Sequence, residues 1–374
     1  MEVLGTIAAF LAVLVVLVVV HELGHFLAAK AAGITVQEFA VGFPPRIASR
    51  IWRGTRYSVN WIPLGGFVKM LGEDGDIEAQ KLRQRGLSEA AVEEAMAGAF
   101  NRKPIYVRVG VLLAGVVMNF LLAGVLFSIA SGMPQYQAQG GLVVSSINPG
   151  SPAEDAGLQP NDVILAANGR TFVASVDLTT YLRGQAGTPV RLTVRRDGAE
   201  RTLTVIPNSV TDEDLRKGKG AVGFTWHGER IAEVPAPAGN PIEAVQLGFG
   251  GAAELAIQLP GALVDAIGGI LGLNPNAGQA AGPIGIAEQT GEVLSGPFVY
   301  FLSFVGLLSL NLAVLNVLPF PPLDGGRIAV VLIEAVRRRR LPAEREALIY
   351  LTGFMVLIVL VILISIQDVQ RLVE

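Results

Sequence analysis

The sequence VLGTIAAFLAVLVVLVVV, residues Val3–Val20, is an uninterrupted apolar run, and the motif HELGH follows it directly at residues 21–25. A helix of about 20 apolar residues crosses the roughly 30 Å hydrocarbon core of a bilayer. Ionisable side chains are costly near hydrocarbon, so their presence there indicates a functional site. We therefore expect the chain to begin with a membrane-spanning helix that ends in a chemically active motif.

Composition places the chain outside the class of ordinary soluble proteins. Of its 374 residues, 51% are hydrophobic and only 16% are charged, and the mean hydropathy is +0.50. The formal net charge of -3 gives no indication of nucleic-acid binding, which depends on a basic surface. The chain has no cysteine, so any bound metal must be held by histidine, aspartate or glutamate.

Long apolar segments predict four transmembrane helices, because each is long enough to cross a bilayer. They cover roughly Val3–Ala29, Tyr106–Ala130, Phe298–Leu318 and Ala347–Ile366. The first could instead be a cleaved signal peptide, but it lacks a basic start and a small-residue cleavage site before the motif. Another stretch, Pro241–Leu273, is interrupted at Pro260 and lacks flanking charges. We expect it to form helices at the membrane surface, with a fifth span as the alternative.

Basic residues set the expected orientation, because loops rich in Lys and Arg stay in the cytoplasm. They cluster after the first apolar segment, before the second, and between the third and the fourth. These residues are Lys30, Arg46, Arg50, Arg53, Arg56, Arg102, Lys103 and Arg337–Arg340. We therefore expect both termini and the 131–297 region outside the cytoplasm, and the first and third segments to end near the cytoplasmic face.

The region between the second and third segments divides into two parts. Gln139–Pro207 alternates apolar and polar residues between Gly, Pro and Asn turns, which is typical of a small β-rich domain. The predicted fold is therefore a polytopic α-helical membrane protein with an inserted extracytoplasmic β-rich domain. Its expected parts are an N-terminal membrane region at 1–135, the β-rich domain at 136–210, a linker with membrane-surface helices at 211–297, and a C-terminal membrane region at 298–374.

The HExxH motif predicts a zinc site on the first helix. His21 and His25 are four residues apart and project from one helical face, where two imidazoles can share one Zn²⁺. Glu22 lies beside them and can take a proton from water activated by the metal. This combination indicates an enzyme that hydrolyses peptide bonds within or beside the bilayer. The alternative is a helix with two interfacial histidines and no metal.

A third ligand is expected on another buried segment. Asp324 is the only acid between Glu292 and Glu334, and it follows the third apolar segment at the same predicted depth as the histidines. A carboxylate would complete a His₂-carboxylate site of the kind found in catalytic zinc centres. The alternative is that Asp324 is a turn residue in a Pro- and Gly-rich exit from the helix.

HExxH in the first span, together with N-x-x-P-x-P-x-L-D-G at residues 316–325, resembles the site-2 protease family of intramembrane zinc metalloproteases. Four spans around an extracytoplasmic module resemble the bacterial regulator-of-sigma-E protease branch, and the resemblance covers nearly the whole chain. It implies that His21, His25 and Asp324 bind zinc and that Glu22 is the catalytic acid and base.

The Gly-rich segment Asn60–Gly72 resembles the membrane-reentrant β-loop that follows the first span in this family. An unpaired strand edge there would bind an extended substrate by strand addition. The expected contacts are Gly65, Gly66, Phe67 and Val68. Asn316 is the motif position expected to bond the backbone of an unwound substrate. The alternatives are an ordinary cytoplasmic hairpin and an asparagine that bonds a neighbouring helix.

Part of the β-rich region resembles a bacterial PDZ domain. The resemblance rests on the start at Gly141–Val144, on Ser151–Ile164 and on Asn168-Gly169. PDZ grooves capture chain ends by adding a strand. The expected groove residues are Gly141, Leu142 and Val143. There is room for a single PDZ domain, whereas some relatives carry two in tandem.

The resemblance implies a multi-pass protein of the bacterial inner membrane that binds zinc and cleaves transmembrane segments of single-span proteins. Expected substrates are anti-sigma factors already cut outside the membrane, and remnant signal peptides. The expected partners are these substrates, the lipid bilayer and a peptide or chain-end ligand of the PDZ domain, with no nucleic acid. Two other classes stay open here: a membrane scaffold with an inactive motif, and a metal-handling membrane protein with further ligands along a pathway.

Overall fold

The computed structural model describes residues 2–73, 77–171, 175–209, 220–270, 282–339 and 341–373. The chain forms two compact units. The membrane unit consists of Met1–Met133 and Pro237–Glu374, and the inserted unit is Pro134–Ala236. The inserted unit thus extends beyond residue 210, where the sequence places the end of the β-rich domain, because a later strand returns to its sheet.

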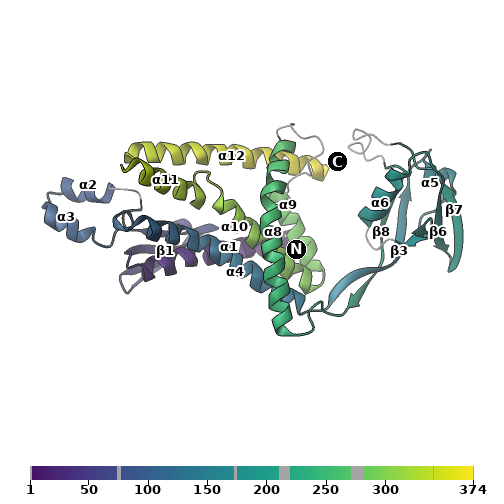
Figure 1. The fold of residues 1–374 in the computed structure, drawn as a ribbon, viewed down its shortest axis with the longest axis horizontal. Coiled ribbons are helices and arrows are strands. Elements are labelled where there is room, and N and C mark those ends of the chain that lie inside the picture. The colour runs from purple at the N-terminus through teal and green to yellow at the C-terminus, as the bar shows by residue number, and fades with distance from the viewer. Residues whose placement is uncertain are drawn as a thin grey trace. The chain divides into compact units, whose positions relative to one another are not determined.

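Among the described residues of the membrane unit, five helices are long and apolar enough to cross a bilayer (Figure 1). They are α1 (Glu2–Ala31), α4 (Ile105–Ser131), α8 (Pro241–Ile270), α10 (Phe298–Val317) and α12 (Ala343–Val373). Four of them correspond to the four predicted spans. The fifth, α8, has a mean hydropathy of 1.3, against 2.2 to 3.0 for the others. Pro260 lies inside α8 without ending it, so the interruption expected at this residue does not occur.

Shorter helices connect these long ones. They are α2 (Ile77–Gln84), α3 (Glu89–Ala95), a 3₁₀ turn at Phe100–Arg102, α9 (Pro283–Ser295) and α11 (Asp324–Arg337). α11 begins at Asp324, and the six residues of a Pro-rich turn separate it from the end of α10 at Val317. The first carboxylate of α11 is therefore held next to the inner end of α10.

α4 is the centre of the membrane unit, where it packs against α1, α8, α10 and α11. Gly115, Asn119 and Ser128 are buried along it. Small residues let membrane helices approach closely and polar ones bond across them. One such bond joins α10 to α4, because the Ser309 hydroxyl donates to the Asn119 carbonyl at 2.9 Å.

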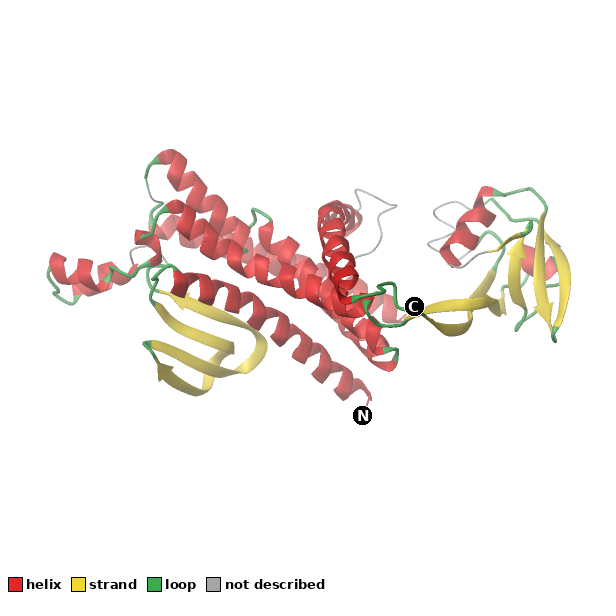
Figure 2. Ribbon diagram, turned by 60° about the horizontal axis from the view of Figure 1, so that its bottom comes forward, coloured by secondary structure: helices red, strands yellow, loops and turns green. Residues whose placement is uncertain are grey.

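A β-structured loop follows α1 and packs beside it (Figure 2). β1 (Val36–Trp52) and β2 (Thr55–Met70) pair antiparallel. Both strands are long and bent, so that Phe39 pairs with Val68 on one side and with Tyr57 on the other. Residues 66–70 therefore flank β1, and no other described strand pairs with their outer edge.

The inserted unit is built on a six-stranded sheet in the order β7-β6-β4-β3-β8, with β5 paired to β4. Its elements are β3 (Gln135–Ile147), α5 (Pro152–Asp155), β4 (Val163–Ala167), β5 (Arg170–Thr171), α6 (Ser175–Gly184), β6 (Val190–Arg196), β7 (Ala199–Val205) and β8 (Phe224–Val234). Its core includes Val144, Leu178, Leu192 and Val194, each at most 2% exposed. Because β8 pairs along β3, the sheet needs residues that lie beyond 210.

Candidate metal centre

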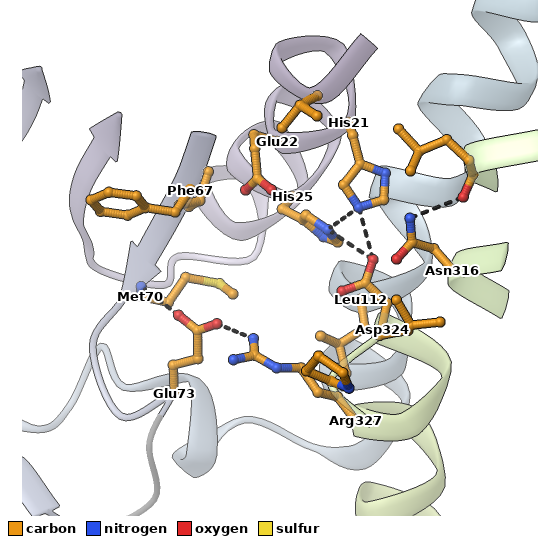
Figure 3. Close-up of a pocket in the computed structure, with 15 residues that line it drawn as sticks. His21, Glu22, His25, Phe67, Met70, Glu73, Leu112, Asn316, Asp324 and Arg327 are labelled. Carbon is orange, nitrogen blue, oxygen red and sulfur yellow. Dashed lines mark hydrogen bonds and ion pairs between the residues drawn. The ribbon is translucent and has the colours of Figure 1, made fainter. Parts of the chain in front are cut away.

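Three possible ligand atoms converge where the C-terminal half of α1 meets the start of α11 (Figure 3). His21 Nε2 lies 2.9 Å from Asp324 Oδ2. His25 Nε2 lies 3.2 Å from the same oxygen and 3.2 Å from His21 Nε2. Both histidines are buried, and the Asp324 side chain is 13% exposed. The structure thus brings together the two halves of the predicted site, which are 303 positions apart in the sequence.

This donor set fits zinc. Two imidazole nitrogens and one carboxylate oxygen are ligands that Zn²⁺ takes in catalytic sites, where a fourth position stays open. Ligand atoms about 2.1 Å from a tetrahedral ion stand about 3.4 Å apart. The three atoms here are separated by 2.9 to 3.2 Å, so an ion needs only a small expansion of the cluster.

The orientation of His25 is set by the backbone of α4. Its Nδ1–H donates to the Val111 carbonyl at 2.8 Å. A neutral imidazole carries one N–H, so this bond leaves Nε2 with a free lone pair that faces the cluster. Ligating histidines typically hold their second nitrogen in this way.

Gly115 provides the space in which the two imidazoles meet. A Cβ atom at this position would lie 2.4 Å from His25 Nε2 and 2.8 Å from His21 Cε1. Any side chain there would push against the ligands. Neither Gly115 nor Val111 was predicted from the sequence as part of the site. The one sequence feature that pointed to Gly115 was its position one helical turn before Asn119 in an apolar span.

The cluster opens into a cavity of about 330 Å³. Glu22 lines this cavity, and in Figure 3 it lies between His25 and Phe67. Phe67 and Val68, from the free edge of β2, form part of the wall, and Asn316 of α10 forms another part. The Glu22 carboxylate, the cluster of possible metal ligands and a strand edge therefore face one cavity.

Gly65 and Gly66 of the β-structured loop have different surroundings. A Cβ at Gly66 would be 3.7 Å from Glu22 Cγ and 2.7 Å from the Ala40 carbonyl oxygen, so this strand approaches α1 closely. Gly65 lies against the ring of Phe43 and does not line the cavity.

The Asn316 amide donates to the Leu312 carbonyl at 2.9 Å, within its own helix.

An ion pair that the sequence analysis missed joins the loop to α11. Arg327 pairs with Glu73, whose other carboxylate oxygen accepts from the Met70 N–H at 3.0 Å. Both residues line the cavity. Burial by itself lowers the pKa of Arg327, but Glu73 outweighs it and leaves the pKa above its ordinary value. The guanidinium therefore stays charged one turn away from Asp324.

Asp324 is held as a carboxylate. Burial by itself raises its pKa, but the hydrogen bond from His21, together with the neighbouring His25, outweighs burial and holds the pKa of Asp324 well below its usual range. An ionised carboxylate is the form that binds a metal. The electrostatics of the cluster thus agree with its geometry.

The expected groove residues of the inserted unit lie in the middle of its sheet. Leu142 and Val143 of β3 pair with β4 on one side and with β8 on the other, and Gly141 precedes them in the same strand. Strand addition requires a free edge, and β8 is the terminal strand in the sheet order. A small apolar cavity of about 50 Å³ lies between α6 and residues 220–226, next to β8.

Comparison with known proteins gives the same assignment as the site. The model of peptidase family M50 matches residues 9–360. The chain belongs to peptidase family M50. As a member of this family it is a zinc metalloendopeptidase and a multi-pass membrane protein, and the resemblance to the site-2 proteases is confirmed.

The relatives of this M50 peptidase match it over almost its whole length. It is 29% identical to the zinc metalloprotease RasP of Geobacillus kaustophilus, and the match covers 99% of both chains. It is 28% identical to the regulator of sigma-W protease RasP of Bacillus subtilis, over 98% of this chain and 99% of the other. A solved PDZ domain of an SdrC-like protein from Listeria monocytogenes covers 23% of this chain and 87% of the other at 22% identity, with a TM-score of 0.20.

Proposed function

We propose that this M50 peptidase cleaves the transmembrane segments of single-span membrane proteins. In this proposal His21, His25 and Asp324 hold the zinc ion and Glu22 is the general acid and base. The observation that carries it is the cavity at the end of α1, where the three ligand atoms, the Glu22 carboxylate and the free edge of β2 meet.

The chemistry follows from the positions of these groups. When bound, zinc acts as a Lewis acid that polarises the scissile carbonyl and lowers the pKa of water towards neutrality. Glu22 accepts a proton from the attacking water and then delivers it to the leaving amine. Asn316 bonds the backbone of the substrate from the α10 side of the cavity.

A transmembrane substrate must unwind before it is cut, because a helix keeps its carbonyls in i to i+4 hydrogen bonds. The outer edge of residues 66–70 offers unpaired backbone groups beside Glu22. We assign this edge to substrate binding by strand addition, with Gly66, Phe67 and Val68 as the contacts and Gly65 shaping the strand behind them.

The proposed orientation puts the cavity near the cytoplasmic face of the bacterial inner membrane, with both termini outside. α1 and α10 both end at the metal centre, so they run in the same direction. An odd number of membrane crossings must therefore lie between α1 and α10. α4 is one such crossing. A second crossing by α8 would make the number even, and α9, with 13 residues, is too short to cross the membrane and make it odd again. We therefore place α8 along the membrane surface. In Figure 1 it runs across the direction of the other long helices.

In this arrangement α1 enters, α4 returns, α10 enters and α12 returns, which gives the four predicted spans. Both inward helices then carry the site to the cytoplasmic side, where the basic loops lie. Substrates proposed for this arrangement are anti-sigma factors that a first protease has cut outside, and remnant signal peptides. A chain end captured by the inserted unit would bind at the free edge of β8 beside α6.

The test is reconstitution of the purified protein with a model single-span substrate. Glu22→Gln is expected to keep zinc and lose cleavage, whereas Asp324→Asn weakens both. Glu288→Gln, an exposed position on α9, is the matched control and keeps both. Undiminished cleavage by Glu22→Gln contradicts the mechanism, and undiminished zinc in a His21→Ala/His25→Ala variant contradicts the ligand assignment.

A further inference from the structure

Asn119 is a fully buried polar residue in the middle of the apolar helix α4. Its Nδ2 lies 3.4 Å from His21 Nδ1. Its Oδ1 has no hydrogen-bond partner among the described residues. An unsatisfied buried polar atom costs free energy, so this oxygen needs an explanation.

The chemistry of the imidazole supplies one. With the contacts present here, His21 Nε2 can donate to Asp324 Oδ2 at 2.9 Å, and Nδ1 then accepts from the Asn119 amide. A metal on Nε2 requires that nitrogen to be unprotonated, which moves the single N–H of the neutral ring to Nδ1. Nδ1 then becomes a donor, and it needs an acceptor where the amide NH₂ group now lies.

We propose that Asn119 is the positioning residue of His21. A half-turn about its Cβ–Cγ bond exchanges the amide nitrogen for Oδ1, which accepts the Nδ1–H of His21 when Nε2 binds the metal. The inference rests on the proposed role of His21 as a zinc ligand. An amide suits both states, because one end of it donates and the other accepts.

The partner of the other histidine supports this role. His25 Nδ1 is held by the Val111 carbonyl, and His21 Nδ1 faces the side chain of Asn119. Residues 111, 115 and 119 lie on one face of α4 at intervals of four. A single helix therefore holds both ring nitrogens that point away from the metal and leaves room for the rings at Gly115.

A purely structural role for Asn119 makes a different prediction. Its backbone carbonyl accepts from the Ser309 hydroxyl at 2.9 Å, which ties α4 to α10. If Asn119 served only packing, loss of that tie and loss of the side chain would have similar effects. Ser309→Ala is therefore the matched control, because it disturbs the same point of the helix without touching His21.

The experiment measures zinc affinity by chelator competition and the visible spectrum of the Co²⁺-substituted protein. The full-length purified variants are Asn119→Leu, Asn119→Asp, Ser309→Ala and His21→Ala. We expect Asn119→Leu to bind zinc about 10- to 100-fold more weakly, the range found for the partners of ligating histidines, and to alter the Co²⁺ spectrum. Asn119→Asp keeps an acceptor and restores the affinity, whereas Ser309→Ala keeps wild-type affinity and spectrum.

The outcomes separate this inference from the proposed function. Wild-type zinc affinity and Co²⁺ spectrum in Asn119→Leu overturn the role of Asn119, as does an Asn119→Asp variant that is folded yet binds as weakly as Asn119→Leu. In both cases loss of zinc from His21→Ala leaves the ligand assignment standing. Retention of zinc by His21→Ala overturns the ligand assignment itself. If Asn119→Asp does not fold, the comparison of Asn119→Leu with Ser309→Ala still decides.

Discussion

At the scale of single residues, Gly115 determines how closely the two histidines approach α4. The space of one absent methyl group is occupied by the edges of both imidazoles. Protein interiors are close-packed, so an added atom there must displace its neighbours. The imidazoles of His21 and His25 are its nearest neighbours, and the proposed metal centre is therefore the part of the fold most sensitive to this position.

Gly115→Ala is expected to reduce cleavage by about 100-fold, the scale of a 1 Å misplacement of reacting groups, and to weaken zinc binding. Zinc content and cleavage of a model substrate measure the effect. Gly110→Ala on the same helix is the control, because nothing lies within 4 Å of a Cβ at that position. Equal activity of the two variants would contradict this role of Gly115.

The chemical groups of the centre were predictable from the sequence, whereas their supports were not. His21, Glu22 and His25 stand out because ionisable side chains are costly beside an apolar run, and Asp324 stands out because acids are scarce around it. The carbonyl of Val111 leaves no trace in the sequence, because every residue carries one. Asn119 was visible as a polar residue within a span, but its partner depends on how two helices pack.

At the scale of elements, α9 depends on a carboxylate from another helix. Asp368 of α12 is 2% exposed, and it accepts from the Gly282 N–H at 3.1 Å and the Gly285 N–H at 3.0 Å. The first turn of a helix has N–H groups without partners, and a carboxylate is favourable there. A Cβ at Gly282 would lie 2.6 Å from the Asp368 carboxylate, which explains a glycine at the start of the GPIG segment.

Asp368→Ala is expected to lower the free energy of unfolding by about 1–3 kcal/mol, the cost of leaving buried donors unsatisfied. Unfolding of the purified protein in detergent measures this loss. Zinc content of the folded fraction should not change, because Asp368 does not line the metal cavity. Gln370→Ala, an exposed neighbour on α12, should leave the stability within about 0.5 kcal/mol of wild type.

Apolar runs predicted the long helices well, since burial of a whole segment in hydrocarbon is a local property of the sequence. The run Tyr106–Ala130 became α4 at Ile105–Ser131, and Phe298–Leu318 became α10 at Phe298–Val317. The course of β2 was not predictable to the same degree. Its pairing with both sides of β1 joins residues far apart in the chain, and no local pattern specifies it.

At the scale of the whole molecule, the inserted unit has its own core and its own buried ion pair. Arg196 donates to both carboxylate oxygens of Asp162 at 2.6 Å, and the Asp162 side chain is 1% exposed. Burial by itself raises the pKa of Asp162, but Arg196 and the Gln159 N–H outweigh it and leave the pKa below its ordinary value. Folding of this unit is therefore linked to pH.

Because the pKa of Asp162 is lower in the folded state, its stabilising contribution is complete above its unfolded pKa of about 3.9. The contribution is lost as the pH falls through the folded value. The hydrogen-exchange protection of the described residues of this unit, corrected for the intrinsic exchange rate, is expected to fall below about pH 4 in the full-length protein. Asp162→Asn should remove most of this pH dependence and speed exchange at neutral pH. Exposed Asp155→Asn is the control, and an unchanged acid response in Asp162→Asn would contradict the assignment.

The inserted unit begins and ends at neighbouring points. Gln135 pairs with Val234 where the chain enters and leaves it, and on the membrane side the Ala238 N–H donates to the Ser131 carbonyl at 3.1 Å. The two chain segments that connect α4 and α8 to the inserted unit are therefore adjacent, and the inserted unit takes the place of a loop between these helices. An insertion or exchange at this point of the chain therefore leaves the helix packing around His21, His25 and Asp324 unchanged.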